Sequence, residues 1–227
     1  MVRARRSTIV WKIAMALTGV IFIAYVLAHM YGNLKVFGGQ DAFDTYAEHL
    51  REFGEPILPH AGFLWLIRVV LIVSLLVHAV AAYRLWARAA GARSHRYAMK
   101  KATKSTLSSR TMRWGGTAIL LFVVFHLLNL TTRTITPGGD SDSPYQRMLN
   151  TFAPENWWMV VIYLLAMVAL GMHLRHGVFS AAQTLGYTSS QSARAFWNRA
   201  GWTVAVIVAG GFALVPLSII LGLVPDA

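Results

Sequence analysis

Five long apolar runs, almost free of charged residues, decide what this chain can fold into. The runs cover Ile13–Leu34, Ala61–Tyr83, Trp114–Thr132, Asn156–Leu174 and Ala200–Pro225. A helix of about 20 apolar residues crosses the ~30 Å hydrocarbon core of a bilayer, so each run is about long enough to span it. Only 13% of the 227 residues are charged, and no pattern typical of β-strands is evident. The sequence therefore predicts an all-α integral membrane protein with five transmembrane helices in one bundle.

We expect these helices at about residues 11–34, 61–88, 113–134, 156–183 and 200–223. Residues 41–53 place apolar side chains at helical spacing among charged ones, which predicts a short amphipathic helix on the outer surface. Residues 88–112 form a long basic loop. The first run also resembles a signal peptide, but it is longer than the apolar part of such a segment, so we expect it to persist as the first helix.

Charged residues are distributed unevenly between the two ends of the predicted bundle. Sixteen of the 21 Lys and Arg residues precede the first helix, lie in or beside the basic loop, or follow the middle of the fourth helix. All nine acidic residues lie at the opposite end. By the positive-inside rule, the N terminus and the basic loop are cytoplasmic. The net charge of +12 then reflects orientation in the membrane and contact with anionic lipid, so we expect no nucleic-acid partner.

Histidine is the residue type most able to carry chemistry in this bundle. The chain has no cysteine, which excludes a disulfide, a thiolate-bound iron–sulfur cluster and a c-type haem attachment within it. Three of the eight histidines fall in predicted loops and are expected to be solvated: His49, His60 and His95. Four others lie one in each of the first four helices: His29, His78, His126 and His173. An ionisable residue inside a membrane helix is a functional candidate, although one alone is more often a hydrogen-bonded packing residue.

The depths of these four histidines sort them into two pairs. His29 and His126 lie six and seven residues before the charged outer ends of their helices, roughly 9–10 Å at 1.5 Å per residue. His78 and His173 lie toward the cytoplasmic ends of helices that run the other way. We call these the outer pair (His29 and His126) and the inner pair (His78 and His173). Two facing imidazoles suit the axial positions of haem b, whereas a tetrahedral zinc site would need further ligands.

Several segments around these histidines resemble a known family. They are His29–Gly38, Ser109–Trp114, Phe125–Leu128 and His173–Gly186. Together they resemble the cytochrome b membrane-anchor subunit of succinate dehydrogenase (succinate:menaquinone oxidoreductase), of the five-helix, di-haem type that related fumarate reductases also use. The resemblance runs from about residue 8 to 223, and the motifs of the first and fourth helices are its specific parts.

The resemblance implies which residues bind the haems. By position, the outer pair binds an outer haem b and the inner pair binds an inner haem b. His176 lies one turn beyond His173, and the spacing from His173 to the following Gly177, Ser180 and Gly186 makes His173 the expected ligand. His176 is then expected either to contact a haem propionate or a partner subunit, or to be a packing residue.

Further residues are implied as contacts of the haems or of a quinone. Arg68 lies in the outer half of the second helix, where it needs an anionic partner such as a haem propionate, unless it snorkels to the surface. The residues expected near the inner haem propionates or an iron–sulfur subunit are Ser109, Arg110 and Arg113. A quinone site near the outer haem has as candidates for quinone contacts or proton handling Glu48, Glu52, Glu55 and Arg68.

The resemblance also implies partners and a direction of electron flow. A flavoprotein subunit would oxidise succinate in the cytoplasm of a bacterium, and an iron–sulfur subunit would bind the basic face of the chain in the plasma membrane. Electrons would pass through the inner and then the outer haem to menaquinone. Some family members carry a carboxylate two residues before the ligand of the fourth helix, where this chain has Gly171. This departure favours succinate oxidation over fumarate reduction.

Two other functions fit parts of the sequence. A haem b subunit of a formate dehydrogenase or hydrogenase would share the haems but bind different soluble partners. A transporter or a haem-free anchor would use the histidines for substrate binding or packing, although no inverted repeat or pair of broken helices supports a transporter. Haem content separates a transporter or haem-free anchor from the two haem b subunits. Co-purifying flavin and iron–sulfur protein separates the succinate dehydrogenase anchor from the subunit of a formate dehydrogenase or hydrogenase.

Overall fold

Five helices in the computed structural model are long and apolar enough to cross a membrane. The structure describes residues 8–91 and 107–225, and over these residues the chain is helical with no strand. The five helices are α1 (Thr8–Asn33), α3 (Gly62–Gly91), α4 (Leu107–His126), α6 (Trp157–Thr184) and α7 (Gln191–Ile220). The expectation of an all-α chain with five candidate membrane-spanning helices is therefore confirmed.

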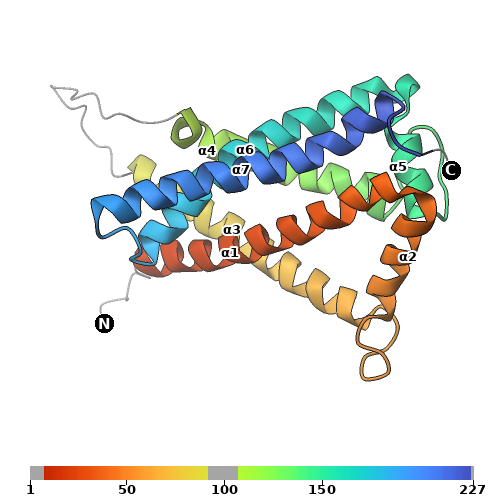
Figure 1. The fold of residues 1–227 in the computed structure, drawn as a ribbon. Helices are drawn as coiled ribbons and strands as arrows, with labels where there is room; N and C mark the ends of the chain where they lie inside the picture. The colour runs from red at the N-terminus through yellow and green to blue at the C-terminus, as the bar shows by residue number, and fades with distance from the viewer. Residues whose placement is uncertain (1–7, 92–106, 226–227) are drawn as a thin grey trace.

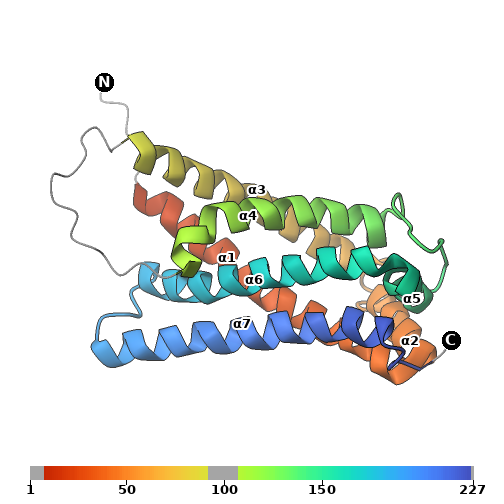
Figure 2. The same ribbon diagram turned by 90° about the horizontal axis from the view of Figure 1, so that it is seen from above.

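Short helices gather at one end of the bundle. The expected amphipathic segment forms α2 (Gly39–Glu52), which follows the 3-10 turn η1 (Leu34–Gly38) and connects α1 to α3. A second short helix, α5 (Pro144–Phe152), lies beside it at the same end (Figures 1 and 2). We refer to this end as the α2/α5 end; it is the end predicted to face outward.

Several features of the helices differ from the sequence-based expectation. α3 continues to Gly91 rather than ending near 88, and α4 begins at Leu107 rather than near 113, so both helices extend into the segment expected to be a basic loop. α7 begins at Gln191 rather than near 200, because the hydroxyl of Ser190 accepts a hydrogen bond from the backbone N–H of Ala193 (3.1 Å) and caps the helix there. α4 ends as an α-helix at His126 and continues as a π-helical segment, η2 (Leu127–Thr131). α5 was not expected. Its N terminus is capped by Ser143, with a proline in the first turn.

α6 is the central helix of the bundle. It packs along α7, α4 and α1, while α3 packs along α1 and leaves it toward the α2/α5 end (Figure 1). In the most apolar 18-residue stretch of α6, 33% of the residues are buried, against 6% in the corresponding stretches of α3 and of α4. α3 and α4 therefore gain little burial from direct contact with neighbouring helices, and their outward apolar side chains suit a lipid environment.

The close contact between α1 and α7 depends on one glycine. Gly211 lies against Met30, and a Cβ atom at this position would overlap the Met30 sulfur. Glycine therefore allows the two helices to approach closely, as small residues do in membrane bundles. This contact holds the part of α1 that carries His29.

Candidate functional site

The outer pair lies between α1 and the end of α4. The ring centroids of His29 and His126 are 5.9 Å apart, and the two ring planes are inclined by 80°. Aromatic side chains surround both rings: Tyr25 stacks on His29 with centroids 5.4 Å apart, and Phe122 lies 5.8 Å from His126. The two imidazoles therefore face each other in an apolar setting near the α2/α5 end.

The inner pair lies between α3 and α6. The ring centroids of His78 and His173 are 6.2 Å apart, with an interplanar angle of 55°. Glycines of two further helices face this pair. A Cβ atom on Gly19 of α1 would lie 3.7 Å from Cε1 of His78, and one on Gly116 of α4 would lie 3.4 Å from Cε1 of His173. The backbone that lies beside each ring of the inner pair therefore carries no side chain.

The distance between the inner and the outer pair along the bundle axis can be obtained separately from α1 and from α4. On α1, Thr18 contacts His78 of the inner pair, and His29 of the outer pair lies eleven residues further on, a rise of about 16 Å at 1.5 Å per residue. On α4, Gly116 faces His173 and His126 lies ten residues further on, a rise of about 15 Å. The bundle therefore contains two histidine pairs stacked along its axis.

Each pair joins helices that do not otherwise pack closely. Among the described residues, neither α1 with α4 nor α3 with α6 forms an extended backbone contact. The two imidazoles of each pair therefore approach each other from helices that are not in close backbone contact. This is the arrangement that a flat group inserted between the two rings requires.

The spacing of the rings fits coordination of one metal from opposite sides. An imidazole nitrogen binds a transition metal at about 2 Å and lies about 1 Å from its ring centroid, so two opposed ligands have centroids roughly 6 Å apart. The outer and inner pairs, at 5.9 and 6.2 Å, both match this value. In the described part of the chain no group of three or more His, Cys, Asp or Glu side chains could hold a metal ion. A metal at either pair therefore needs ligands from elsewhere, as the four porphyrin nitrogens of haem provide.

The hydrogen bonds of the rings are also compatible with metal binding. Nδ1 of His78 lies 3.0 Å from the Thr18 hydroxyl, which donates to the backbone carbonyl of Ala14 (2.8 Å). Nδ1 of His173 is buried and has no hydrogen-bond partner within the residues that the structure describes. Buried polar atoms are rarely left unpaired in native proteins, and this nitrogen is free to contact a group that is not part of the chain.

The other residues singled out in the sequence lie apart from the rings. Arg68 is exposed on α3, its guanidinium 4.9 Å from the centre of the Trp65 ring, and it interacts electrostatically with Tyr25, which stacks on His29. His176 is half-buried one turn beyond His173. Arg113 lies over the Trp86 ring at 5.4 Å. Ser109 and Arg110 belong to the first turns of α4, and their side chains lie outside the described part of the structure.

The acidic candidates lie on the outer connection between α1 and α3. Glu48 pairs with Arg51 at 2.6 Å, and Glu55 lies 3.2 Å from Nδ1 of His60. Glu52 is exposed at the end of α2, as is His49, while His95 lies outside the described residues. These carboxylates form a polar surface at the α2/α5 end.

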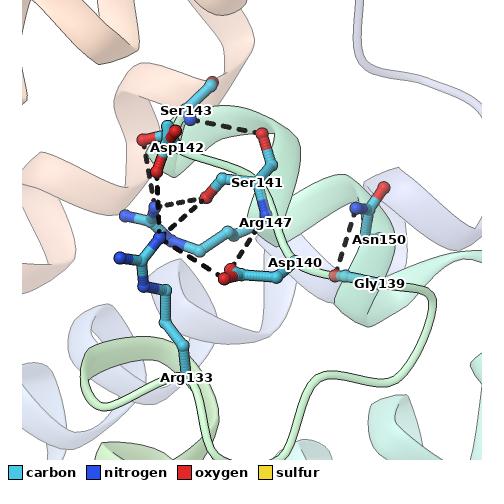
Figure 3. Close-up of polar contacts among 8 residues, drawn as sticks. All are labelled: Arg133, Gly139, Asp140, Ser141, Asp142, Ser143, Arg147 and Asn150. Atoms are coloured by element: carbon cyan, nitrogen blue, oxygen red, sulfur yellow. Dashed lines mark hydrogen bonds and ion pairs between the residues drawn. The ribbon is translucent and has the colours of Figure 1, made fainter.

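A folded polar loop covers the same end between η2 and α5. Arg133 pairs with Asp140 (3.4 Å) and Asp142 (3.2 Å), and Arg147 donates to the backbone carbonyl of Ser141 at 2.7 Å (Figure 3). Partial burial and the charge of Arg133 lower the pKa of Arg147 from its ordinary value. These contacts hold the segment between η2 and α5 in one folded arrangement.

Sequence reasoning missed three polar residues that contact the paired rings or their neighbours: Thr18, Asn129 and Tyr163. Each is a polar residue within an apolar run, and this position was the feature of the sequence that could have identified it. Comparisons of the chain with family models, with curated proteins and with solved structures found no match.

Proposed function

We propose that this chain is the di-haem cytochrome b membrane anchor of a bacterial succinate dehydrogenase. In this role the N terminus is cytoplasmic, the flavoprotein and iron–sulfur subunits bind the basic end, and menaquinone accepts the electrons near the outer pair. The two histidine pairs support haem binding, while the motifs around His29 and His173 support this family in particular. The bundle would lie in the plasma membrane.

The observation that carries the proposal is the pairing of four histidines at two depths. Each pair has the centroid spacing of opposed axial ligands, and each joins two helices that are not in close backbone contact. Haem iron bound by two histidines takes up and releases one electron at a time. The residues of the chain hold the axial positions, and aromatic side chains such as Phe22, Phe122 and Phe212 keep water from the rings.

Three of the described arginine–tryptophan contacts lie toward the end proposed to be cytoplasmic, while a fourth, Arg68 with Trp65, lies near the α2/α5 end. At the end opposite α2 and α5, guanidinium groups lie 4.6 to 5.4 Å from the centres of indole rings. The pairs are Arg84 with Trp11, Arg113 with Trp86, and Arg175 with Trp202. Aromatic residues are typical of both membrane interfaces, whereas an excess of basic residues is typical of the cytoplasmic one, where anionic lipids bind.

A haem assay of the purified chain tests the proposal. A pyridine haemochrome spectrum is expected to give two b haems per chain, and purification from its natural membrane is expected to bring flavin and iron–sulfur protein in fixed ratio. A well-folded chain without haem would contradict the cytochrome assignment. Two haems accompanied by soluble subunits that lack succinate-reducible flavin would instead indicate another haem b oxidoreductase.

A pair of neighbouring glycines offers a matched test of the space beside the inner pair. Gly116→Leu is expected to lower the haem content from two per chain toward one, because a side chain there grows from a Cβ that already touches the His173 ring. Gly115→Leu adds the same side chain one residue away, where a Cβ meets nothing within 4 Å, and is expected to keep both haems. Equal haem contents in the two variants would show that this space is not used.

A further inference from the structure

A buried chain of hydrogen bonds reaches one ring of the outer pair. Nδ1 of His126 lies 3.2 Å from the hydroxyl of Tyr163 on α6. The same hydroxyl donates to Oδ1 of Asn129 at 2.7 Å, and Nδ2 of Asn129 donates to the backbone carbonyl of Ile135 at 2.8 Å. Tyr163 and Asn129 are 7% and 2% exposed, so none of these bonds is replaced easily by water.

The directions of these hydrogen bonds determine where the His126 ring carries its proton. Asn129 uses its amide N–H toward Ile135, so its carbonyl oxygen faces Tyr163 and can only accept. The Tyr163 hydroxyl has one proton, which it donates to that oxygen. Toward His126 the hydroxyl can therefore only accept, which places the proton on Nδ1 and leaves Nε2 with a free lone pair. Nε2 is then the atom available to a metal.

The local backbone explains how these groups come together. Asn129 lies in the π-helical segment η2, three residues after His126, and this wider turn brings its side chain to the buried side of the helix. Single π-helical turns within α-helices are frequent at functional sites. The Tyr163 ring is held by edge contacts with Phe122 and Phe152, at centroid distances of 5.0 and 4.8 Å. The acceptor for His126 is thus rigidly placed.

We propose that Tyr163 and Asn129 are positioning residues that fix the tautomer and orientation of His126 and thereby lower the midpoint potential of the outer haem. An imidazole whose Nδ1–H donates a hydrogen bond is a stronger electron-pair donor to a metal at Nε2. Stronger donation favours the oxidised ion. The part concerning the potential rests on the proposed haem function. The part concerning the tautomer does not depend on bound haem.

The inner pair has a weaker counterpart of this network. The Thr18 hydroxyl donates to the backbone carbonyls of its own helix, at 2.8 Å to Ala14 and 3.2 Å to Met15, and so accepts from Nδ1 of His78. Thr18→Val therefore removes the side-chain acceptor at the other pair, while the backbone of Met15, which also hydrogen-bonds to His78, remains. The two variants, Tyr163→Phe and Thr18→Val, serve as controls for each other because they address different haems.

The first test uses the full haem-free chain with ¹⁵N-labelled histidine. Nitrogen NMR distinguishes a ring protonated on Nδ1 from one protonated on Nε2, and His126→Gln assigns the signal. Native His126 is expected to be protonated on Nδ1, and Tyr163→Phe is expected to populate the Nε2-protonated form. Native His126 protonated on Nε2 would overturn the proposal, whether or not the chain binds haem.

The second test is a redox titration of the haem-loaded chain, followed by the absorbance of the reduced haems. Tyr163→Phe is expected to keep two haems and raise one midpoint potential, while Thr18→Val raises the other. Tyr163→Phe in a His29→Ala background, which retains the inner haem alone, is expected to shift nothing. Phe152→Leu alters the packing on Tyr163 but leaves its hydroxyl. An equal shift of the midpoint potential in Phe152→Leu would show that Tyr163 acts only through packing.

Three further outcomes of these tests are decisive. Two haems with unchanged potentials in Tyr163→Phe would overturn the tuning of the outer haem. A Tyr163→Phe chain that loses the outer haem is judged by the nitrogen spectrum, where an unchanged His126 tautomer overturns the proposal and a changed one supports it. A native chain without haem overturns the proposed function, and the tautomer measurement still decides the role of Tyr163.

Discussion

His29→Ala and His126→Ala are each expected to lower the haem content from two per chain to one, and the double variant is expected to retain one as well. The reason is that both residues hold the same group: their rings face each other at 5.9 Å from α1 and α4. Removal of either axial ligand leaves a haem with one histidine, and removal of the second takes nothing more away. A pyridine haemochrome assay on the three variants measures this directly.

The control for this prediction is a histidine of the same end that faces water. His49→Ala and His60→Ala change exposed residues of the outer connection and are expected to keep two haems. A double variant of His29 and His126 with no haem would show that the two residues serve different haems. Two haems in either single variant would remove that residue from the ligand set.

The second large effect separates His173 from its neighbour His176. His173→Ala is expected to leave one haem per chain, because its ring is the one that faces His78 at 6.2 Å. His176→Ala is expected to leave two, because His176 lies one turn further along α6. The two variants remove the same side chain from the same helix, so the difference in haem content reports position alone.

The opposite outcome is equally clear. A His176→Ala chain with one haem, together with a His173→Ala chain with two, would transfer the ligand role to His176 and shift the inner haem by one turn. The 6.2 Å spacing between the rings of His173 and His78 argues for the expected outcome, in which His173 is the ligand. The absorbance of the remaining outer haem in His173→Ala shows that the bundle has folded.

The depth of a residue in a membrane helix could be predicted from the sequence, whereas its neighbours across the bundle could not. Helical rise is constant, so counting residues from the charged ends places His29 with His126 and His78 with His173, and the structure brings together these same residues. Which face a residue presents depends on the rotation of each helix, and an all-apolar helix gives little sign of it. Tyr163 could therefore not be linked to His126 from the sequence.

Local irregularities were also beyond the sequence pattern. The π-helical turn after His126 depends on backbone carbonyls of Leu127 and Leu128 that accept from residues of the following loop, not on a characteristic residue type. α5 was missed because its stability comes from distant contacts. Asp44 of α2 accepts hydrogen bonds from the Ser143 hydroxyl (2.5 Å) and from the backbone N–H of Tyr145 (3.0 Å), about a hundred positions away.

Because few residues of α3 are buried, the stability of the bundle would depend on a group bound between α3 and α6. A helix with 6% of its apolar window buried gains little free energy from its neighbours, since van der Waals packing drives helix association in lipid. A group that binds to α3 and α6 together stabilises the state in which both are in place, and this stabilisation grows with the logarithm of its free concentration. If the inner pair binds a haem as proposed, docking of α3 against α6 would be a ligand-binding equilibrium as much as a folding step.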